Sequence, residues 1–180
     1  MTRTFQPLTY SENAIDERAI TQKLGARVVR LSFDSAQPVL EVTRENLLSV
    51  VGTLKSDPEL AYNFFTDLTC ADLSEKPSFD TEKRFQVIII LYSLTHKRRI
   101  RLRVFVPEDD PRCPSLTPLF AGADLTERKA HEMFGVKFEG HPNLIRLLTP
   151  SYMKDYPLRK EYPVTGKGER DNFPRYEEIQ

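Results

Sequence analysis

Residues 84–106 read RFQVIIILYSLTHKRRIRLRVFV, and this stretch decides the fold. Its first part, residues 84–94, is rich in Val and Ile, which favour strands. The polar residues 95–98 predict a turn. In residues 99–106 the apolar side chains Ile100, Leu102 and Val104 alternate with arginines, as they do in a strand that buries one face. The stretch therefore predicts a β-hairpin with one face in the core and the other in water or against charged partners.

The preceding sequence adds helices and shorter strands around this hairpin. Residues 13–24 predict a helix that ends at Gly25. Thr43 is expected to cap a second helix, whose buried side is expected to hold Leu47, Leu48, Val50, Val51 and Leu54. Strands are expected at 26–33, at 39–42 and in the mixed segment 62–69. This order predicts an α+β fold: a mainly antiparallel sheet with helices packed on one face.

After Val106 the sequence changes character, because nine of the 13 prolines lie from Pro107 onward. Asp124 is expected to cap a short helix, with Glu127 completing a capping box and Gly135 ending the helix. Beyond residue 149 the recurrent prolines forbid regular helix. We therefore expect an α+β domain over residues 1–149 and an extended proline-rich C-terminal arm over residues 150–180.

Composition excludes several classes of protein. Lys and Arg number 26 and so do Asp and Glu, and this balance argues against a dedicated nucleic-acid-binding protein. The two cysteines, Cys70 and Cys113, are too few for a tetrahedral metal site and are expected to be reduced thiols. The first residues lack the apolar region of a signal peptide, and no run approaches the ~20 apolar residues of a membrane span.

A metal site is one candidate for chemistry. Glu127 and His131 share a helix face at i,i+4 and His141 follows on a turn, so the three residues fit a stand-alone metal-dependent enzyme. However, His131-Glu132 is followed by Met133-Phe134, so the HExxH zinc motif is absent. A solvent-facing or interfacial polar pair on a capped helix is the simpler interpretation.

A nucleic-acid site is the other candidate, since basic residues gather along the hairpin. They are Lys83, Arg84, Lys97, Arg98, Arg99, Arg101 and Arg103. No aromatic residues are interleaved with the arginines, so the stacking platform of a single-strand binder is missing. A solvated sheet face, or one that meets acidic residues of a partner, is the favoured interpretation.

Three segments resemble a known family. Residues 127–142 read ERKAHEMFGVKFEGHP, residues 144–149 read LIRLLT and residues 156–163 read YPLRKEYP. This order of motifs resembles the signature of the 30-kDa subunit family of respiratory complex I, which is the C-type subunit of NADH:quinone oxidoreductase. The chain departs from the family pattern at Leu125, Lys129, His131 and Ile145.

The resemblance implies a set of signature or interface residues. They are Glu127, Arg128, Glu132, Met133, Phe134, Gly135, Gly140, His141, Pro142, Arg146, Pro157, Leu158, Arg159 and Lys160. Arg128 is expected to reach a carboxylate through both arms of its guanidinium. The aromatic residues expected to anchor the arm on a partner are Tyr152, Tyr156, Tyr162, Phe173 and Tyr176.

The resemblance also implies a function without catalysis by this chain. It predicts a peripheral-arm subunit of a proton-translocating NADH:quinone (ubiquinone) oxidoreductase that supports the quinone-binding module by packing on the D-type, 49-kDa subunit. The chain itself is expected to bind no cofactor, whereas the complex uses FMN, iron–sulfur clusters, NADH and quinone. Subunits of the B and I types are further expected partners. The expected location is peripheral, on the cytoplasmic side of a bacterial inner membrane.

A close alternative is that the chain belongs to the same family but is a subunit of a related complex. Equivalent subunits of plastoquinone-reducing complexes and of membrane-bound hydrogenases share the signature. The identity of the companion subunits distinguishes these complexes.

Overall fold

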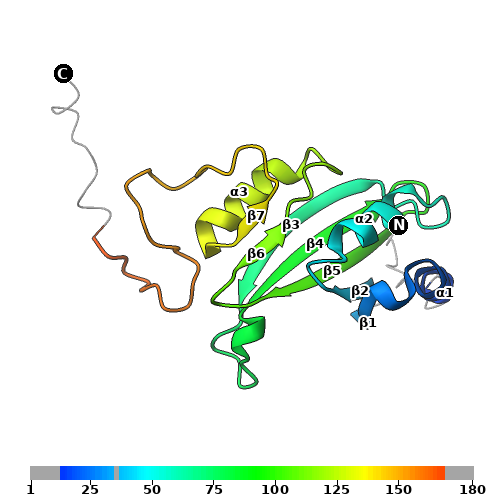
Figure 1. Cartoon of the computed structure of the whole chain (residues 1–180), viewed down its shortest axis with the longest axis horizontal. Helices are drawn as coiled ribbons and strands as arrows, with labels where there is room; N and C mark the ends of the chain where they lie inside the picture. The colour runs from blue at the N-terminus through cyan, green and yellow to red at the C-terminus, as the bar shows by residue number, and fades with distance from the viewer. Residues whose placement is uncertain (1–12, 35–36, 169–180) are drawn as a thin grey trace, which may run out of the picture. The chain divides into compact units, whose positions relative to one another are not determined.

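A computed structural model describes residues 13–34 and 37–168, and Figure 1 shows their helices and strands. The described residues form two compact units. Unit 1 holds the residues up to Leu68 together with Ile88–Phe105, and unit 2 holds Thr69–Val87 together with the residues from Val106 onward. Strands β3, β4 and β5 have residues in both.

Three α-helices and seven strands occur in the described residues. In chain order they are α1 (Asn13–Leu24), β1 (Val28–Asp34), β2 (Gln37–Val42), α2 (Leu47–Ser56), β3 (Phe64–Asp72), β4 (Phe85–Ser93), β5 (Arg98–Val106), β6 (Arg112–Pro114), α3 (Ala123–Phe134) and β7 (Lys137–Glu139). Short 3-10 helices occupy Gly25–Arg27 and Thr81–Lys83.

The larger sheet has the strand order β1-β2-β5-β4-β3. β1 and β2 are antiparallel, with Leu31 opposite Leu40, but β2 runs parallel to β5, with Leu40 opposite Leu102. The α+β class is confirmed, whereas the sheet is mixed. Sequence periodicity identifies each strand but carries no information on which distant strand becomes its neighbour, so the parallel pair was not foreseen.

In unit 1, α2 packs through one apolar stripe. Leu47, Val50, Val51 and Leu54 recur at helical spacing and all are buried. The expectation that Leu48 is buried with them is wrong: it lies off this stripe and is 39% exposed. Thr43, the expected cap, lies outside the helix, because Asn46 precedes its first residue and makes no side-chain cap bond.

Polar contacts join the elements of unit 1 at its rim. The Arg27 guanidinium donates to the hydroxyls of Ser49 and Thr53 on α2, at 2.8 and 3.1 Å. Lys23 of α1 pairs with the carboxylates of Asp57 and Glu59. These contacts tie α1 and the residues that follow it to α2 and to the loop after α2.

The hairpin β4–β5 has the alternation that the sequence predicts. Ile100, Leu102 and Val104 are fully buried, and Arg99, Arg101 and Arg103 occupy the intervening positions. On β4 the buried set is Phe85, Val87, Ile89 and Leu91. The period of two therefore sets the core face of both strands.

In unit 2, α3 packs against a small parallel sheet made of β6 and β7, as Figure 1 shows. Cys113 of β6 pairs with Phe138 of β7, and both side chains are buried. Gly135 ends α3 as predicted, with φ +82° and its N–H bonded to the His131 carbonyl. Cys70 and Cys113 are free, buried thiols.

Beyond Thr149 the described residues up to 168 form turns and bends, without helix or strand. We call residues 150–162 the strap. Phe173 and Tyr176, two of the expected anchors, lie outside the described residues. Among the described residues, no helix is both long enough and apolar enough to cross a membrane.

The buried face of β5 gives a direct test of the fold. We expect Leu102→Ala to lower the free energy of unfolding by about 2–5 kcal/mol, because the substitution leaves a cavity in a fully packed core. Leu94→Ala is the matched control, since Leu94 is 59% exposed in the turn of the same hairpin. Its cost should stay below about 0.5 kcal/mol. Urea denaturation measures both, and equal losses would contradict the assignment of faces.

Candidate functional site

The signature helix α3 carries two buried carboxylates, and Glu127 is the first. Its Oε2 accepts from the Ser115 hydroxyl and its Oε1 from the Leu116 backbone N–H, both at 2.7 Å. The predicted capping box is therefore wrong: Gly122 precedes the helix, and Glu127 points into unit 2 instead of back to the helix start. Burial raises the pKa of Glu127, and its hydrogen bonds only partly oppose this.

Glu132 is the second buried carboxylate. It accepts the backbone N–H groups of Leu147, Leu148 and Thr149 at 2.7, 3.0 and 3.2 Å, and also the Thr149 hydroxyl. Burial disfavours its ionised form, but these donors outweigh burial and lower the pKa of Glu132. One ionised side chain thus holds three consecutive backbone donors of a segment that has no regular structure.

Arg128 binds backbone carbonyl groups of the same segment, whereas Glu132 binds its N–H groups. Its Nε and Nη2 donate to the carbonyls of Ile145 and Arg146, at 3.0 and 3.3 Å. The expected two-armed contact with a carboxylate is not seen among the described residues, where Arg128 pairs with Asp124 at a distance of 4.0 Å between Nη1 and Oδ2. Arg128 and Glu132 together hold residues 145–149 along α3.

This arrangement leaves large apolar side chains in water. Leu125, Ile145, Leu147 and Leu148 are all exposed, and Leu148 is 66% exposed. Leu125 shares a helix face with Arg128 and Glu132 at the spacing i, i+3 and i+7, and these two residues hold the segment that carries the other three. We call these four residues the α3 apolar surface. Such a cluster is typical of a binding surface.

The two histidines that suggested a metal site have other partners. His131 donates from Nδ1 to the Val136 carbonyl at 2.9 Å. The Nδ1 of His141 accepts the Asn143 N–H, so its Nε2 carries the proton and donates to the Asp124 carbonyl. No group of three or more His, Cys, Asp or Glu side chains in the described residues is placed to hold a metal ion. The metal-dependent alternative therefore finds no support in the geometry of Glu127, His131 and His141.

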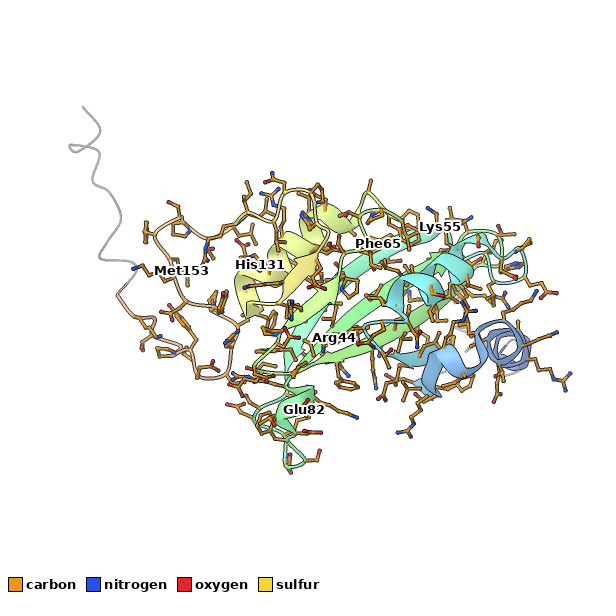
Figure 2. All side chains as sticks on the ribbon, in the orientation of Figure 1. Arg44, Lys55, Phe65, Glu82, His131 and Met153 are labelled. Atoms are coloured by element: carbon orange, nitrogen blue, oxygen red, sulfur yellow. The ribbon has the colours of Figure 1, made fainter. Side chains whose placement is uncertain are left out.

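The strap runs back onto unit 2. Its Leu158 N–H donates to the Met133 carbonyl at 3.1 Å, and Arg159 Nε donates to the Phe134 carbonyl at 2.7 Å. Figure 2 labels Met153 in the strap, whose side chain is buried, and His131 on α3. The strap thus provides donors for carbonyls at the open end of a helix.

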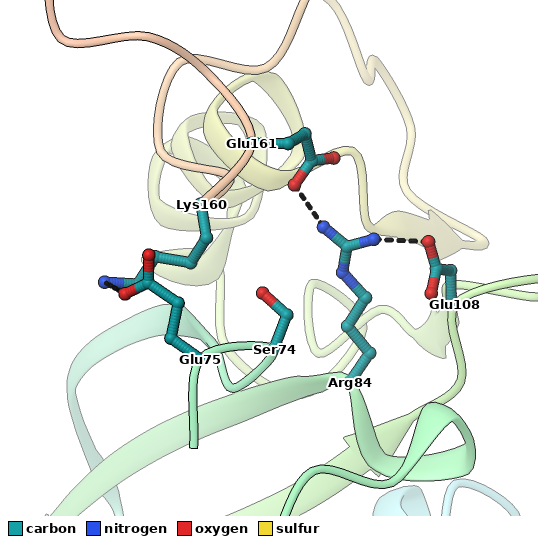
Figure 3. A pocket seen from close by; sticks show the side chains of 6 residues that line it. All are labelled: Ser74, Glu75, Arg84, Glu108, Lys160 and Glu161. Atoms are coloured by element: carbon teal, nitrogen blue, oxygen red, sulfur yellow. Dashed lines mark hydrogen bonds and ion pairs between the residues drawn. The ribbon is translucent and has the colours of Figure 1, made fainter. Parts of the chain in front are cut away.

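An open pocket of about 530 Å³ lies where the strap meets the rest of unit 2. Its lining residues are Ser74, Glu75, Arg84, Glu108, Lys160 and Glu161. Figure 3 shows the Arg84 guanidinium between the carboxylates of Glu108 and Glu161. Beneath the pocket Arg84 also bonds Asp72, with Nη2 3.1 Å from Oδ2, and that same oxygen accepts the Lys160 backbone N–H at 3.0 Å.

The charged groups in the pocket fit a structural role better than a catalytic one. Burial works against ionisation of Asp72, yet the bonds from Arg84, Lys160 and Ser74 prevail and lower its pKa to about 2. Burial likewise disfavours the charged form of Arg84, and its carboxylate partners nevertheless raise its pKa. A general acid or base works best with a pKa near the operating pH. The pKa values of both groups are shifted away from neutral pH, as expected for a permanent ion pair.

The signature residues from the sequence therefore divide into two sets. Glu127, Glu132, Phe134 and Gly135 are buried, and Met133 receives a strap donor through its carbonyl. The side chain of His141 is also buried. The more accessible set, half-buried or exposed, comprises Arg128, Gly140, Pro142, Arg146, Pro157, Leu158, Arg159 and Lys160.

Sequence reasoning missed Asp72, Glu108 and Glu161 as partners of Arg84. They lie 12, 24 and 77 residues from Arg84 along the chain, and no local motif links them to it. Arg84 was grouped with the basic hairpin, but its partners are carboxylates. Arg101 similarly pairs with Asp34 at 2.9 Å. In both cases the carboxylates belong to this chain itself.

Comparison with protein families gives a match over residues 40–168 to the family described as "Respiratory-chain NADH dehydrogenase, 30 Kd subunit". Curated proteins named as the C subunit of NADH-quinone oxidoreductase are similar over most of the chain. The protein from Herpetosiphon aurantiacus is 36% identical, with 83% of this chain and 86% of that protein covered. The one from Citrifermentans bemidjiense is 39% identical, with 85% and 92% covered.

Two solved structures share the fold. One is described as "Nqo5 of the trypsin-resistant fragment (1-134) in P63 form"; it is 28% identical, covers 76% of this chain and 100% of that chain, and has a TM-score of 0.60. The other belongs to the membrane-bound sulfane sulfur reductase, an archaeal respiratory membrane complex. It is 16% identical over 94% of this chain and 99% of that chain, with a TM-score of 0.71, and it speaks for the fold alone.

The Asp72–Arg84 pair predicts a pH-dependent stability. We expect Asp72→Asn to lower the free energy of unfolding at neutral pH by about 2 kcal/mol, since a pKa lowered from 3.8 to about 2 corresponds to that stabilisation. Because the folded-state pKa lies below the unfolded one, the stabilisation is complete above about pH 4 and disappears as the pH falls through about 2.

Urea denaturation between neutral pH and about pH 2.5 measures this effect. The difference between wild type and Asp72→Asn should shrink as the pH falls. Asp109→Asn, at an exposed carboxylate in the same unit, serves as the control and should change stability by less than about 0.5 kcal/mol. A difference that is the same at every pH would contradict the ion pair.

Proposed function

Because this chain belongs to the family of the respiratory-chain NADH dehydrogenase 30 Kd subunit, we propose that it is a non-catalytic peripheral-arm subunit of a proton-translocating NADH:quinone oxidoreductase. The complex transfers electrons from NADH to quinone and couples this transfer to proton transport. In this proposal FMN, the iron–sulfur clusters, NADH and quinone are bound by other subunits. This chain supplies a surface on which they assemble.

The α3 apolar surface is the observation that carries the proposal. Exposed clusters of Leu and Ile cost solvation free energy unless a partner covers them. Arg146 lies within the same segment, half-buried, with Nη1 bonded to the Thr149 hydroxyl at 2.8 Å. An arginine surrounded by apolar side chains is typical of the central part of a protein–protein interface. We assign this surface to the D-type, 49-kDa subunit.

The strap extends the proposed interface. Tyr152 and Leu158 are exposed, and Leu158 projects from a backbone that is bonded to α3. Aromatic and arginine side chains are the commonest anchors of interfaces. The accessible signature residues Gly140, Pro142 and Lys160 would lie at the rim of this contact, while the buried ones hold its shape from within.

The proposed location follows from the partners. The protein would sit on the cytoplasmic side of a bacterial inner membrane and be held there by the complex, with subunits of the B and I types nearby. The interface would then be covered in the assembled arm, which explains how a chain with zero formal net charge tolerates exposed apolar groups.

A pull-down of the tagged full-length chain from cells that produce the complex tests the assignment. Wild type should co-purify with the 49-kDa subunit and with NADH dehydrogenase activity. We expect Leu148→Asp to reduce the recovered 49-kDa subunit by about tenfold or more, because a buried unpaired carboxylate opposes docking. Leu94→Asp is the matched control, with a leucine of similar exposure in unit 1.

Normal recovery with Leu148→Asp would contradict the role of the α3 apolar surface. Recovery of the wild-type chain without any companion subunit would contradict the function itself. Recovery of a hydrogenase subunit, or of the subunits of a plastoquinone-reducing complex, would assign the chain to that related complex instead.

A further inference from the structure

The strap is attached to its own chain by more contacts than its lack of regular structure suggests. Besides the two donors to α3, the Lys160 N–H bonds Asp72, and the Glu161 carboxylate pairs with Arg84. These four contacts fall on consecutive residues, 158–161, and their partners are Asp72 of β3, Arg84 just before β4, and the last two residues of α3. All of these partners lie in unit 2.

Arg159 is the centre of the attachment. Its guanidinium carbon lies 4.9 Å from the centroid of the Phe85 ring and 4.5 Å from that of the Tyr156 ring. A guanidinium within about 6 Å of a ring centroid is attracted to the ring face. Arg159 Nε donates to Phe134, the last residue of α3, where the helix dipole also favours a positive charge.

Gly135 leaves the room that this packing needs. A Cβ atom at Gly135 would lie 2.5 Å from Arg159 Nη2 and 2.7 Å from Tyr156 Cε2. Such distances are too short for non-bonded atoms, so any larger residue must displace the Arg159 and Tyr156 side chains from their packing. The glycine therefore has two reasons to be at this position: its φ of +82° and the close approach of the strap.

We infer that Gly135, Phe85, Tyr156 and Arg159 form a latch that presets the strap on unit 2 before any partner binds. Residues 153–161 then keep one conformation in the free protein. If the proposed function holds, the latch presents Tyr152 and Leu158 already ordered. Docking then costs less conformational entropy than it would with a disordered arm. The latch residues are positioning residues, acting on the interface through the strap.

The chain contains a matched pair of glycines for the test. Gly135 and Gly140 both have φ +82°, but nothing lies within 4 Å of a Cβ placed at Gly140. Alanine therefore introduces the same backbone strain at both positions, and only at Gly135 does it also collide with the latch. Limited trypsin digestion of the isolated full-length chain, followed by mass spectrometry, reports on the bond after Arg159.

We expect Gly135→Ala to be cleaved after Arg159 about tenfold faster than Gly140→Ala, since cleavage requires local opening of the strap. Cleavage after Lys97, in the exposed hairpin turn of unit 1, is the internal reference and should not change. Tyr156→Ala removes one face of the stack without touching α3, and it should also speed cleavage. Equal rates for the two glycine variants, or no effect of Tyr156→Ala, would overturn the latch.

Recovery of the 49-kDa subunit with the same variants separates the latch from the docking proposal. Faster cleavage together with impaired recovery supports both. Faster cleavage with normal recovery supports the latch but contradicts a role of the strap in the interface. Unchanged cleavage overturns the latch whatever the recovery of the 49-kDa subunit.

Discussion

Buried carboxylates that accept backbone N–H groups hold unit 2 together. Much of this unit lacks helix or strand, and backbone donors without a regular partner must still be bonded. Glu132 accepts three consecutive N–H groups, Glu127 accepts the Leu116 N–H, and Asp72 accepts those of Ser74 and Lys160. An ionised carboxylate suits this task because it offers about four acceptor positions and forms strong, charge-assisted bonds.

The same constraint connects structure to function. Because Glu132 and Arg128 bond the backbone of residues 145–149, the side chains of that segment are free to point outward, where Ile145 and Leu148 are exposed. In the pocket around Arg84, the Arg84–Glu161 ion pair and the hydrogen bond from the Lys160 N–H to Asp72 likewise attach the strap. Ionisable groups whose pKa values lie far from neutral pH suit a structural role. Here they hold the surface that we propose meets a partner.

Local patterns in the sequence predicted local features well. The alternation along β5 identified the buried leucine and valine face, and Gly135 ended α3 where the helical pattern stops. Glu127 shows the limit of such patterns. Its spacing from Asp124 fits a capping box, but it binds the Ser115 hydroxyl, twelve residues away, and the Leu116 N–H, eleven residues away. The Asp72 and Arg84 partners of the strap are separated from it by 77 to 88 residues, and no periodicity encodes such contacts. The linked motifs at residues 127–163 identified the family, which is confirmed by the match over residues 40–168.

Amide hydrogen exchange of residues 147–149 tests the central role of the carboxylates most directly. In wild type the three N–H groups should be protected, because Glu132 binds all of them. In Glu132→Ala they should exchange at rates close to those of an unstructured chain, while protection in β1 and β2 remains unchanged. Undiminished protection of residues 147–149 in this variant would show that something other than the Glu132 carboxylate holds the segment, and the account would fail.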